Sequence, residues 1–332
     1  MALFRIFGAG EWGLAIASHL ALLDNTVEVY LRDQTKIDLY QTNNHHDSLD
    51  IKFDNIYFHN INSINNIKKT DKAIDIIATS SSGFLPIIKD NIDYFQSCDS
   101  LSWITKGLDH DSGLLFHEVL DQVLSRKVKK CIISGPSFAK DLVAKKPLEV
   151  SIASSDNLLM DKFITSMHTD LFKLIPTNDI TGIEVSGVLK NISGILAGAL
   201  TANQFSDEYI DELIAISQKE VKRITRSIIE LDSIQVSDIE LERTLESPGC
   251  LGDLRLTCFY NTSRNRQLGL KLTENCDVDK LISRIGTVEG YLSTATLFNN
   301  QSRYGNGSIV RAANDILYNH LKPRNVLDAL FN

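Results

Sequence analysis

The sequence lacks the marks of a disulfide-stapled or metal-binding protein. Its 332 residues include only five cysteines, an odd number without a C-x-x-C pair, which predicts reduced thiols rather than a disulfide framework. The eight histidines form no helix-spaced cluster, so we expect no metal site. A basic excess is missing too, since 34 Lys and Arg stand against 42 Asp and Glu. The net charge of −8 argues against a nucleic-acid or anionic-membrane surface.

Long apolar runs and a targeting segment are also missing. The sequence has no uninterrupted apolar run of about 18 residues and no basic N-terminal region ahead of a long apolar core. We therefore expect a soluble, cytoplasmic protein without stable membrane insertion. A hydrophobic content of 43% and a charged content of 23% are typical of a globular protein. The length exceeds what one hydrophobic core normally serves, which predicts two domains.

The first pattern that is present combines a strand, a glycine-rich turn and a helix. An apolar run at 3–7 is followed by the sequence GAGEWG, by an apolar helical stretch at 14–23 and by a second strand at 27–33. In this context Gly8 permits a tight turn, Gly10 lets backbone approach a pyrophosphate, and Gly13 lets helix and strand touch. The helix N-terminus would face the phosphates. The segment predicts a dinucleotide site.

The end of the second strand bears on the choice of cofactor. A free ribose 2′-hydroxyl usually meets an acid there, whereas a 2′-phosphate favours an arginine fork. This strand ends in Arg32 and Asp33. Arg32 favours NADP slightly, Asp33 leaves NAD open, and a solvated pair without a selective role is equally compatible with the sequence.

Strand-like and helical segments alternate along the first half of the chain. Strands are expected at 73–79, 100–108, 148–154 and 171–176 and within 129–142, with a serine-rich turn at 80–83 before a helix, while 34–70 is assigned a helix and irregular pieces. This order predicts an α/β fold with a doubly wound, mostly parallel sheet. Helical periodicity then takes over. We place a dinucleotide-binding domain at 1–180 and an all-helical substrate and catalytic domain at 181–332.

Two polar features interrupt the helical half. Lys190 lies in the middle of the apolar, glycine-rich stretch 182–200, where a buried lysine needs a partner or a task. An ammonium that reaches solvent along the helix surface is the alternative. Further on, 247–269 contains Asp253 and the run Ser263-Arg264-Asn265, which suits a bidentate grip on a phosphate monoester, although a solvated basic turn is also compatible.

Taken together, seven segments resemble the bacterial-type NAD(P)-dependent glycerol-3-phosphate dehydrogenases. They are GAGEWG, TKGL, GPSFAKDL, GVLKN, GCLGDLRLTC, NTSRNRQLG and VEGY, which occur in the family's order between Gly8 and Tyr291. The resemblance implies reversible reduction of dihydroxyacetone phosphate to sn-glycerol 3-phosphate, a phospholipid precursor. It also implies an N-terminal Rossmann-type domain, a C-terminal all-helical domain, a site in the cleft between them, and a homodimer.

The resemblance also implies roles for individual residues. Its proton donor and acceptor falls on Lys190 and its second active-site lysine on Lys106, with Asp253 beside them. Substrate contacts are implied at Lys106, Gly135, Ser137, Lys190, Asp253, Ser263, Arg264 and Asn265. Cofactor contacts are implied at Gly8, Gly10, Glu11, Trp12, Gly13, Arg32, Lys106, Ala139, Arg264, Thr287 and Glu289.

One stretch departs from the family pattern. Residues 207–217, DEYIDELIAIS, stand where the family has a basic, alanine-rich run, and Ile210 and Ile216 replace its arginines. Two other functions remain open. The chain could be another Rossmann-type reductase with a helical domain, of the hydroxyacid or ketopantoate type, or an inactive nucleotide-binding relative.

Overall fold

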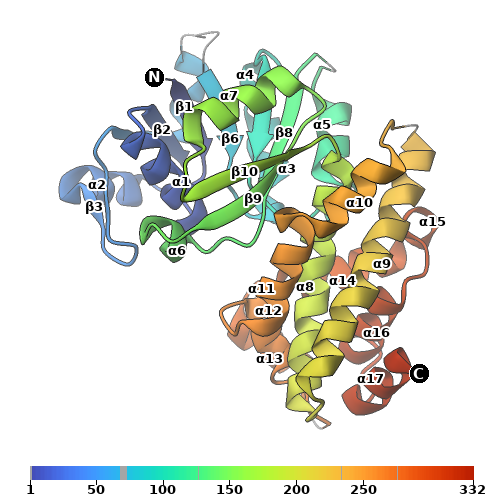
Figure 1. Ribbon diagram of the computed structural model, residues 1–332. Helices are drawn as coiled ribbons and strands as arrows, with labels where there is room; N and C mark the ends of the chain where they lie inside the picture. Colours follow the sequence, from blue (N-terminus) through green and yellow to red (C-terminus); the bar gives the residue numbers. More distant parts are fainter. Residues whose placement is uncertain (1, 68–72, 126, 233, 275) are drawn as a thin grey trace. The chain divides into compact units, whose positions relative to one another are not determined.

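The computed structural model describes residues 2–67, 73–125, 127–232, 234–274 and 276–332 (Figure 1). The chain forms two compact units. Met1–Lys106 and Phe116–Ile180 make up the N-terminal unit, and Gly107–Leu115 and Thr181–Asn332 make up the C-terminal unit. The segment 107–115 precedes residue 180 but belongs to the C-terminal unit, because Leu108 and Leu115 are buried in the hydrophobic core of that unit.

An eight-stranded sheet organises the N-terminal unit, with the strand order β10-β9-β8-β7-β6-β1-β2-β5. Its strands are β1 (Leu3–Phe7), β2 (Thr26–Leu31), β5 (Ile56–Asn60), β6 (Ala73–Ile77), β7 (Ser100–Trp103), β8 (Lys129–Ser134), β9 (Leu148–Ala153) and β10 (Phe172–Thr177). All neighbouring strands pair in parallel except β8 and β9. The order reverses between β1 and β6, which is where doubly wound sheets bind ligands. The predicted mostly parallel, doubly wound fold is confirmed.

Three predicted elements differ from the structure. The polar stretch assigned to irregular pieces contains the edge strand β5, a 3-10 helix at Ile61–Asn66, and a small separate sheet of β3 (His45–His46) and β4 (Ile51–Lys52). Part of that stretch, 68–70, lies outside the described residues. The strand predicted over 100–108 ends at Trp103. The expected turn at 80–83 is mostly helix, since α3 (Ser81–Asp90) begins directly after Ser80.

Helices cover both faces of the sheet, as a parallel sheet requires. The helices of this unit are α1 (Glu11–Leu22), α2 (Gln34–Asn43), α3, α4 (Ile92–Phe95), α5 (Phe116–Val123), α6 (Ala139–Val143) and α7 (Asn157–Met167). Phe4 and Ile6 belong to the core cluster that contains the buried residues of α1 and α7. Phe7, on the opposite face of the same strand, packs its ring edge-on against Phe95 of α4.

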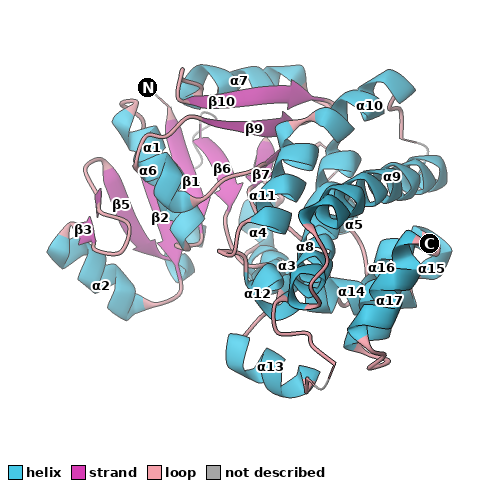
Figure 2. Ribbon diagram, turned by 60° about the horizontal axis from the view of Figure 1, so that its bottom comes forward, coloured by secondary structure: helices cyan, strands magenta, loops and turns pink. Residues whose placement is uncertain are grey.

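The C-terminal unit consists of helices, and Figure 2 shows that the strands belong to the other unit. The helices are α8 (Ile180–Ala202), α9 (Asp207–Asp232), α10 (Asp238–Glu246), a π-helical turn at Pro248–Gly252, α11 (Asp253–Phe259), α12 (Arg264–Gly269), α13 (Val278–Ile285), α14 (Glu289–Asn299), α15 (Gln301–Tyr304), α16 (Ser308–Leu317) and α17 (Pro323–Phe331).

Helix α8 is the core of the C-terminal unit. It is the one helix in the described part of the chain that is long and apolar enough to cross a membrane, but 83% of its apolar window is buried inside the protein. A side chain at Gly198 would meet the carbonyl oxygen of Arg266 at 2.3 Å, so the absence of a side chain lets α8 and α12 pack closely. This burial is typical of the central helix of a folded domain.

Candidate active site

The turn between β1 and α1 has the geometry expected of a phosphate-binding loop. Gly8 has φ +122°, and a Cβ there would lie 2.5 Å from the carbonyl oxygen of Ala78, the residue that follows the neighbouring strand β6. Gly10 has no atom within 4 Å of the position of its missing Cβ, and it precedes α1 directly. A Cβ on Gly13 would lie 3.0 Å from the Cβ of Ala78. The turn therefore fits a dinucleotide pyrophosphate.

The two residues at the end of β2 have different environments. Asp33 is the N-cap of α2, and its carboxylate accepts a hydrogen bond from the backbone N–H of Lys36 at 3.2 Å. The Arg32 side chain is 63% exposed, and its guanidinium lies 3.7 Å from the Asp90 carboxylate. Asp33 is thus engaged in helix capping, while Arg32 can reach a ligand from solvent.

The carboxyl ends of β7 and β8 bring together three of the predicted site residues. The ammonium of Lys106, three residues after β7, donates to the carbonyl oxygen of Gly135 at 2.7 Å. The Ser137 hydroxyl donates to the same oxygen at 3.2 Å. A Cβ on Gly135 would approach the Cα of Val150 to 2.8 Å, so only glycine fits beside β9. Ala139 begins α6, directly after this loop.

Lys190, on α8, has two polar partners within the C-terminal unit. Its side chain is 14% exposed, whereas most residues of α8 are fully buried. Its ammonium donates to the Asp253 carboxylate at 3.2 Å and to the Thr257 hydroxyl at 3.3 Å, both on α11. The Asp253 side chain is 2% exposed. An ammonium held in this way can transfer a proton at a fixed position.

Two features near Lys190 bear on its role as a proton donor. The π-helical turn Pro248–Gly252 leads into α11 and sets the position of Asp253, its first residue. Such turns are frequent at functional sites. Behind the lysine, burial raises the pKa of the Cys258 thiol to about 12, so this thiol stays protonated and does not compete as a base.

The polar residues at the start of α12 differ in burial and in hydrogen bonding. The Arg264 side chain is exposed, and within the described part of the chain it has no hydrogen bond or ion pair. Asn265 is buried and bridges α8 and α14, because its amide donates to Asn191 at 2.8 Å and accepts from the backbone N–H of Gly290 at 2.8 Å. Arg266 is buried, and its guanidinium donates to the side chains of Asn261 and Thr201. Arg264 and the half-buried Ser263 are therefore the groups that remain available to a ligand.

The predicted contacts at the start of α14 lie close to this group. Thr287 is exposed. The Glu289 carboxylate lies 3.0 Å from Nε2 of His110, whose Nδ1 lies 2.9 Å from the Thr296 hydroxyl. The side chains of His110 and Glu289 are each 19% exposed. His110 therefore joins the segment that follows Lys106 to α14.

Family models match both halves of the chain. The model of the NAD-dependent glycerol-3-phosphate dehydrogenase N-terminus matches residues 4–160, and that of its C-terminus matches residues 179–328. The chain belongs to this family. It is 31% identical over 287 residues to the glycerol-3-phosphate dehydrogenase [NAD(P)+] of Vesicomyosocius okutanii, covering 86% of this chain and 83% of that one. The enzyme of the same name from Francisella tularensis subsp. novicida is 29% identical, covering 98% and 96%.

A solved structure agrees with this assignment. The crystal structure of glycerol-3-phosphate dehydrogenase from Coxiella burnetii superposes with a TM-score of 0.85 at 25% identity, over 100% of this chain and 99% of that chain. The predicted membership of the glycerol-3-phosphate dehydrogenases is therefore confirmed, and with it the predicted fold of a mostly parallel sheet followed by helices.

The stretch that departs from the dehydrogenase pattern packs into the C-terminal unit. Ile210 is buried in the core of the C-terminal unit, and Ile216 packs against that core. Asp211 forms an ion pair with Arg255 at 3.1 Å. The apolar replacements therefore add to the core, and one acid of the stretch is paired on the surface.

Three polar residues of the site escaped the sequence analysis. Thr257, the second partner of Lys190, occurs within the motif GCLGDLRLTC but was not singled out. Asn191 follows Lys190 directly and was not assigned a role. His110 contacts Glu289, which is 179 positions away, so no local pattern could have indicated the pair.

Proposed function

We propose that the chain catalyses the reversible reduction of dihydroxyacetone phosphate to sn-glycerol 3-phosphate with NADPH or NADH. The main support is the ammonium of Lys190, which the Asp253 carboxylate and the Thr257 hydroxyl hold in a largely buried position. When bound, the dinucleotide supplies the hydride. Family membership of both halves of the chain supports the same reaction.

The residues of the chain would divide the chemistry as follows. As negative charge grows on the substrate carbonyl oxygen, the Lys190 ammonium stabilises it and then gives it a proton. Asp253 fixes the position of that ammonium. Arg264, with Ser263 beside it, grips the phosphate away from the reacting carbon and converts binding energy into orientation. Lys106 and Ser137, which both donate to the carbonyl oxygen of Gly135, would keep this loop in one conformation.

The direct test mixes the purified protein with dihydroxyacetone phosphate and NADPH or NADH and follows the near-ultraviolet absorbance of the reduced cofactor. We expect the absorbance to fall with both cofactors. No fall with either one would favour the inactive, nucleotide-binding relative. Turnover of ketopantoate or of another 2-oxo acid in place of dihydroxyacetone phosphate would favour the other reductase type, because these substrates have no phosphate for Arg264 to bind.

The environment of β2 leads to a prediction about cofactor preference. Because Asp33 caps α2, we expect Arg32 to read the 2′-phosphate and NADPH to be the better cofactor. Arg32→Ala should raise the KM for NADPH about tenfold, the loss of one charge-assisted contact, and leave the KM for NADH within about twofold. Steady-state kinetics with each cofactor measures both. Equal losses with the two cofactors would contradict this role.

His110 leads to a second prediction. We infer that it positions Glu289, a proposed cofactor contact, by holding the carboxylate at 3.0 Å. His110→Ala should raise the KM for the dinucleotide about fivefold with little change in kcat, because the carboxylate loses one hydrogen bond but the proton donor is untouched. His110→Asn, which can still donate, should recover part of the affinity. A fall in kcat alone would assign His110 to a different task.

We also propose a metabolic role, a cellular location and an oligomeric state for the enzyme. Glycerol 3-phosphate is the backbone precursor of phospholipids, so the enzyme would supply phospholipid synthesis. A cytoplasmic homodimer without membrane insertion is compatible with the burial of α8 and the acidic net charge of −8. Light scattering of the purified protein measures the oligomeric state.

A further inference from the structure

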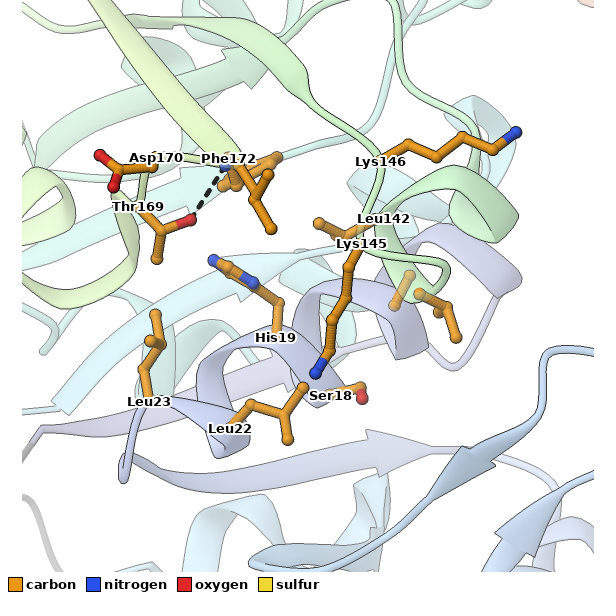
Figure 3. A pocket seen from close by; sticks show the side chains of 13 residues that line it. Ser18, His19, Leu22, Leu23, Leu142, Lys145, Lys146, Thr169, Asp170 and Phe172 are labelled. Atoms are coloured by element: carbon orange, nitrogen blue, oxygen red, sulfur yellow. Dashed lines mark hydrogen bonds between the residues drawn. The ribbon is translucent and has the colours of Figure 1, made fainter.

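The N-terminal unit contains a cavity of about 640 Å³ that belongs to none of the residues assigned above (Figure 3). It lies along the second half of α1, is lined also by α6, by the loop before β9 and by the start of β10, and is open to solvent on one side. Its volume is in the range of small-molecule sites. The dinucleotide turn is at the other end of α1.

The walls of this cavity are mostly apolar. Leu142 and Phe172 are buried in its wall, whereas Leu22, Leu23 and Leu171 are exposed around it, with Leu22 exposed to 66%. Exposed leucines gathered around one cavity differ from the single apolar residues that any surface carries. An apolar chain in the cavity would remove this surface from water, which is favourable.

A single cation is directed at the cavity. In Figure 3 the Lys145 side chain extends along it toward Ser18, and no described residue pairs with its ammonium. The neighbouring Lys146 extends away and forms an ion pair with Asp141 at 2.7 Å. The Asp170 carboxylate also points away from the cavity. The cavity thus combines apolar walls with one unpaired positive charge.

The histidine in the wall does not change this charge. Nε2 of His19 lies 2.7 Å from the carbonyl oxygen of Met167, so this nitrogen carries the proton that is donated. Burial lowers the pKa of His19, so its ring is neutral near pH 7. The ring packs against Phe172 with 4.9 Å between centroids and extends the apolar wall.

We propose that this cavity binds a soluble medium-chain carboxylate, with its alkyl chain against Leu22 and Leu23 and its carboxylate on Lys145 and Ser18. A cation of the same chain length would meet Lys145 with like charge, and a short carboxylate would lack the apolar contact. The proposal goes beyond the dehydrogenase function and is tested without turnover.

Calorimetric titration of the full-length protein with decanoate tests this site. We expect saturable binding of decanoate and none of decyltrimethylammonium or butyrate. Lys145→Asn should weaken decanoate about fivefold, the scale of a partly exposed ion pair, and asparagine tolerates the positive φ of 54° at this position. The matched control Lys146→Asn should stay within twofold, because that lysine points away.

A second variant separates the cavity from other surfaces. Ser18→Trp places a large side chain in the cavity and should abolish decanoate binding while NADPH still binds. Equal affinity for decanoate and decyltrimethylammonium, equal losses in Lys145→Asn and Lys146→Asn, or unchanged binding in a folded Ser18→Trp protein would overturn the proposal. So would an absence of saturable decanoate binding to the original protein.

Discussion

Replacing Lys190 by alanine should lower kcat about a thousandfold while leaving the affinity for NADPH nearly unchanged. The ammonium of Lys190 is the proton donor of this group, because the Asp253 carboxylate accepts a hydrogen bond from it and the raised pKa of the Cys258 thiol keeps that thiol from giving up its proton. The growing oxyanion would lose both its stabilising charge and its proton. Steady-state kinetics gives kcat, and fluorescence titration gives the cofactor affinity.

A control must distinguish the loss of the proton donor from a loss of stability. Lys190→Ala leaves the buried carboxylate of Asp253 without its positive partner, which can destabilise the fold. The double variant Lys190→Met with Asp253→Asn removes both charges and should be equally inactive but more stable. Lys271→Ala, an exposed lysine of the same unit, should keep full activity. Activity of Lys190→Ala within about tenfold of the original would assign the proton transfer to another group.

The dinucleotide turn could be predicted because its determinants are local. Three glycines within six positions, an apolar strand before them and a helix after them set the backbone conformation of the segment. The structure adds the distances that explain Gly8 and Gly13, above all the close approach of Gly8 to Ala78 at the end of the neighbouring strand β6. Strand β5 was missed because only two of its five residues are buried at the sheet edge, so the continuous apolar run of a central strand is absent.

The site in the C-terminal unit was harder to derive from the sequence. Arg264 and Arg266 are two residues apart, so they face different sides of α12, and sequence alone did not show which one is buried. The bridge of Asn265 between α8 and α14 and the contact of His110 with Glu289 join distant segments. Such contacts depend on the packing of whole helices, which local patterns do not specify.

Arg264→Ala should raise the KM for dihydroxyacetone phosphate about a hundredfold, the second-largest effect that we expect. Its guanidinium is exposed and has no partner among the described residues, so the loss concerns the ligand and not the fold. Two charge-assisted hydrogen bonds to a phosphate are worth about 3 kcal/mol when both are lost. Arg264→Lys keeps the charge but loses the planar guanidinium, so its KM should lie between those of the original enzyme and of Arg264→Ala.

Phosphate competition distinguishes this role from a general loss of charge. Inorganic phosphate should inhibit the original enzyme competitively with the substrate, and Arg264→Ala should weaken that inhibition to the same extent as it raises KM, because both ligands use the same contact. Arg255→Ala is the matched control, since Arg255 is an exposed arginine of the same unit that is already paired with Asp211. If Arg255→Ala raised KM as much as Arg264→Ala, the effect would reflect the net charge of the surface, and the phosphate contact would have to be sought at another residue.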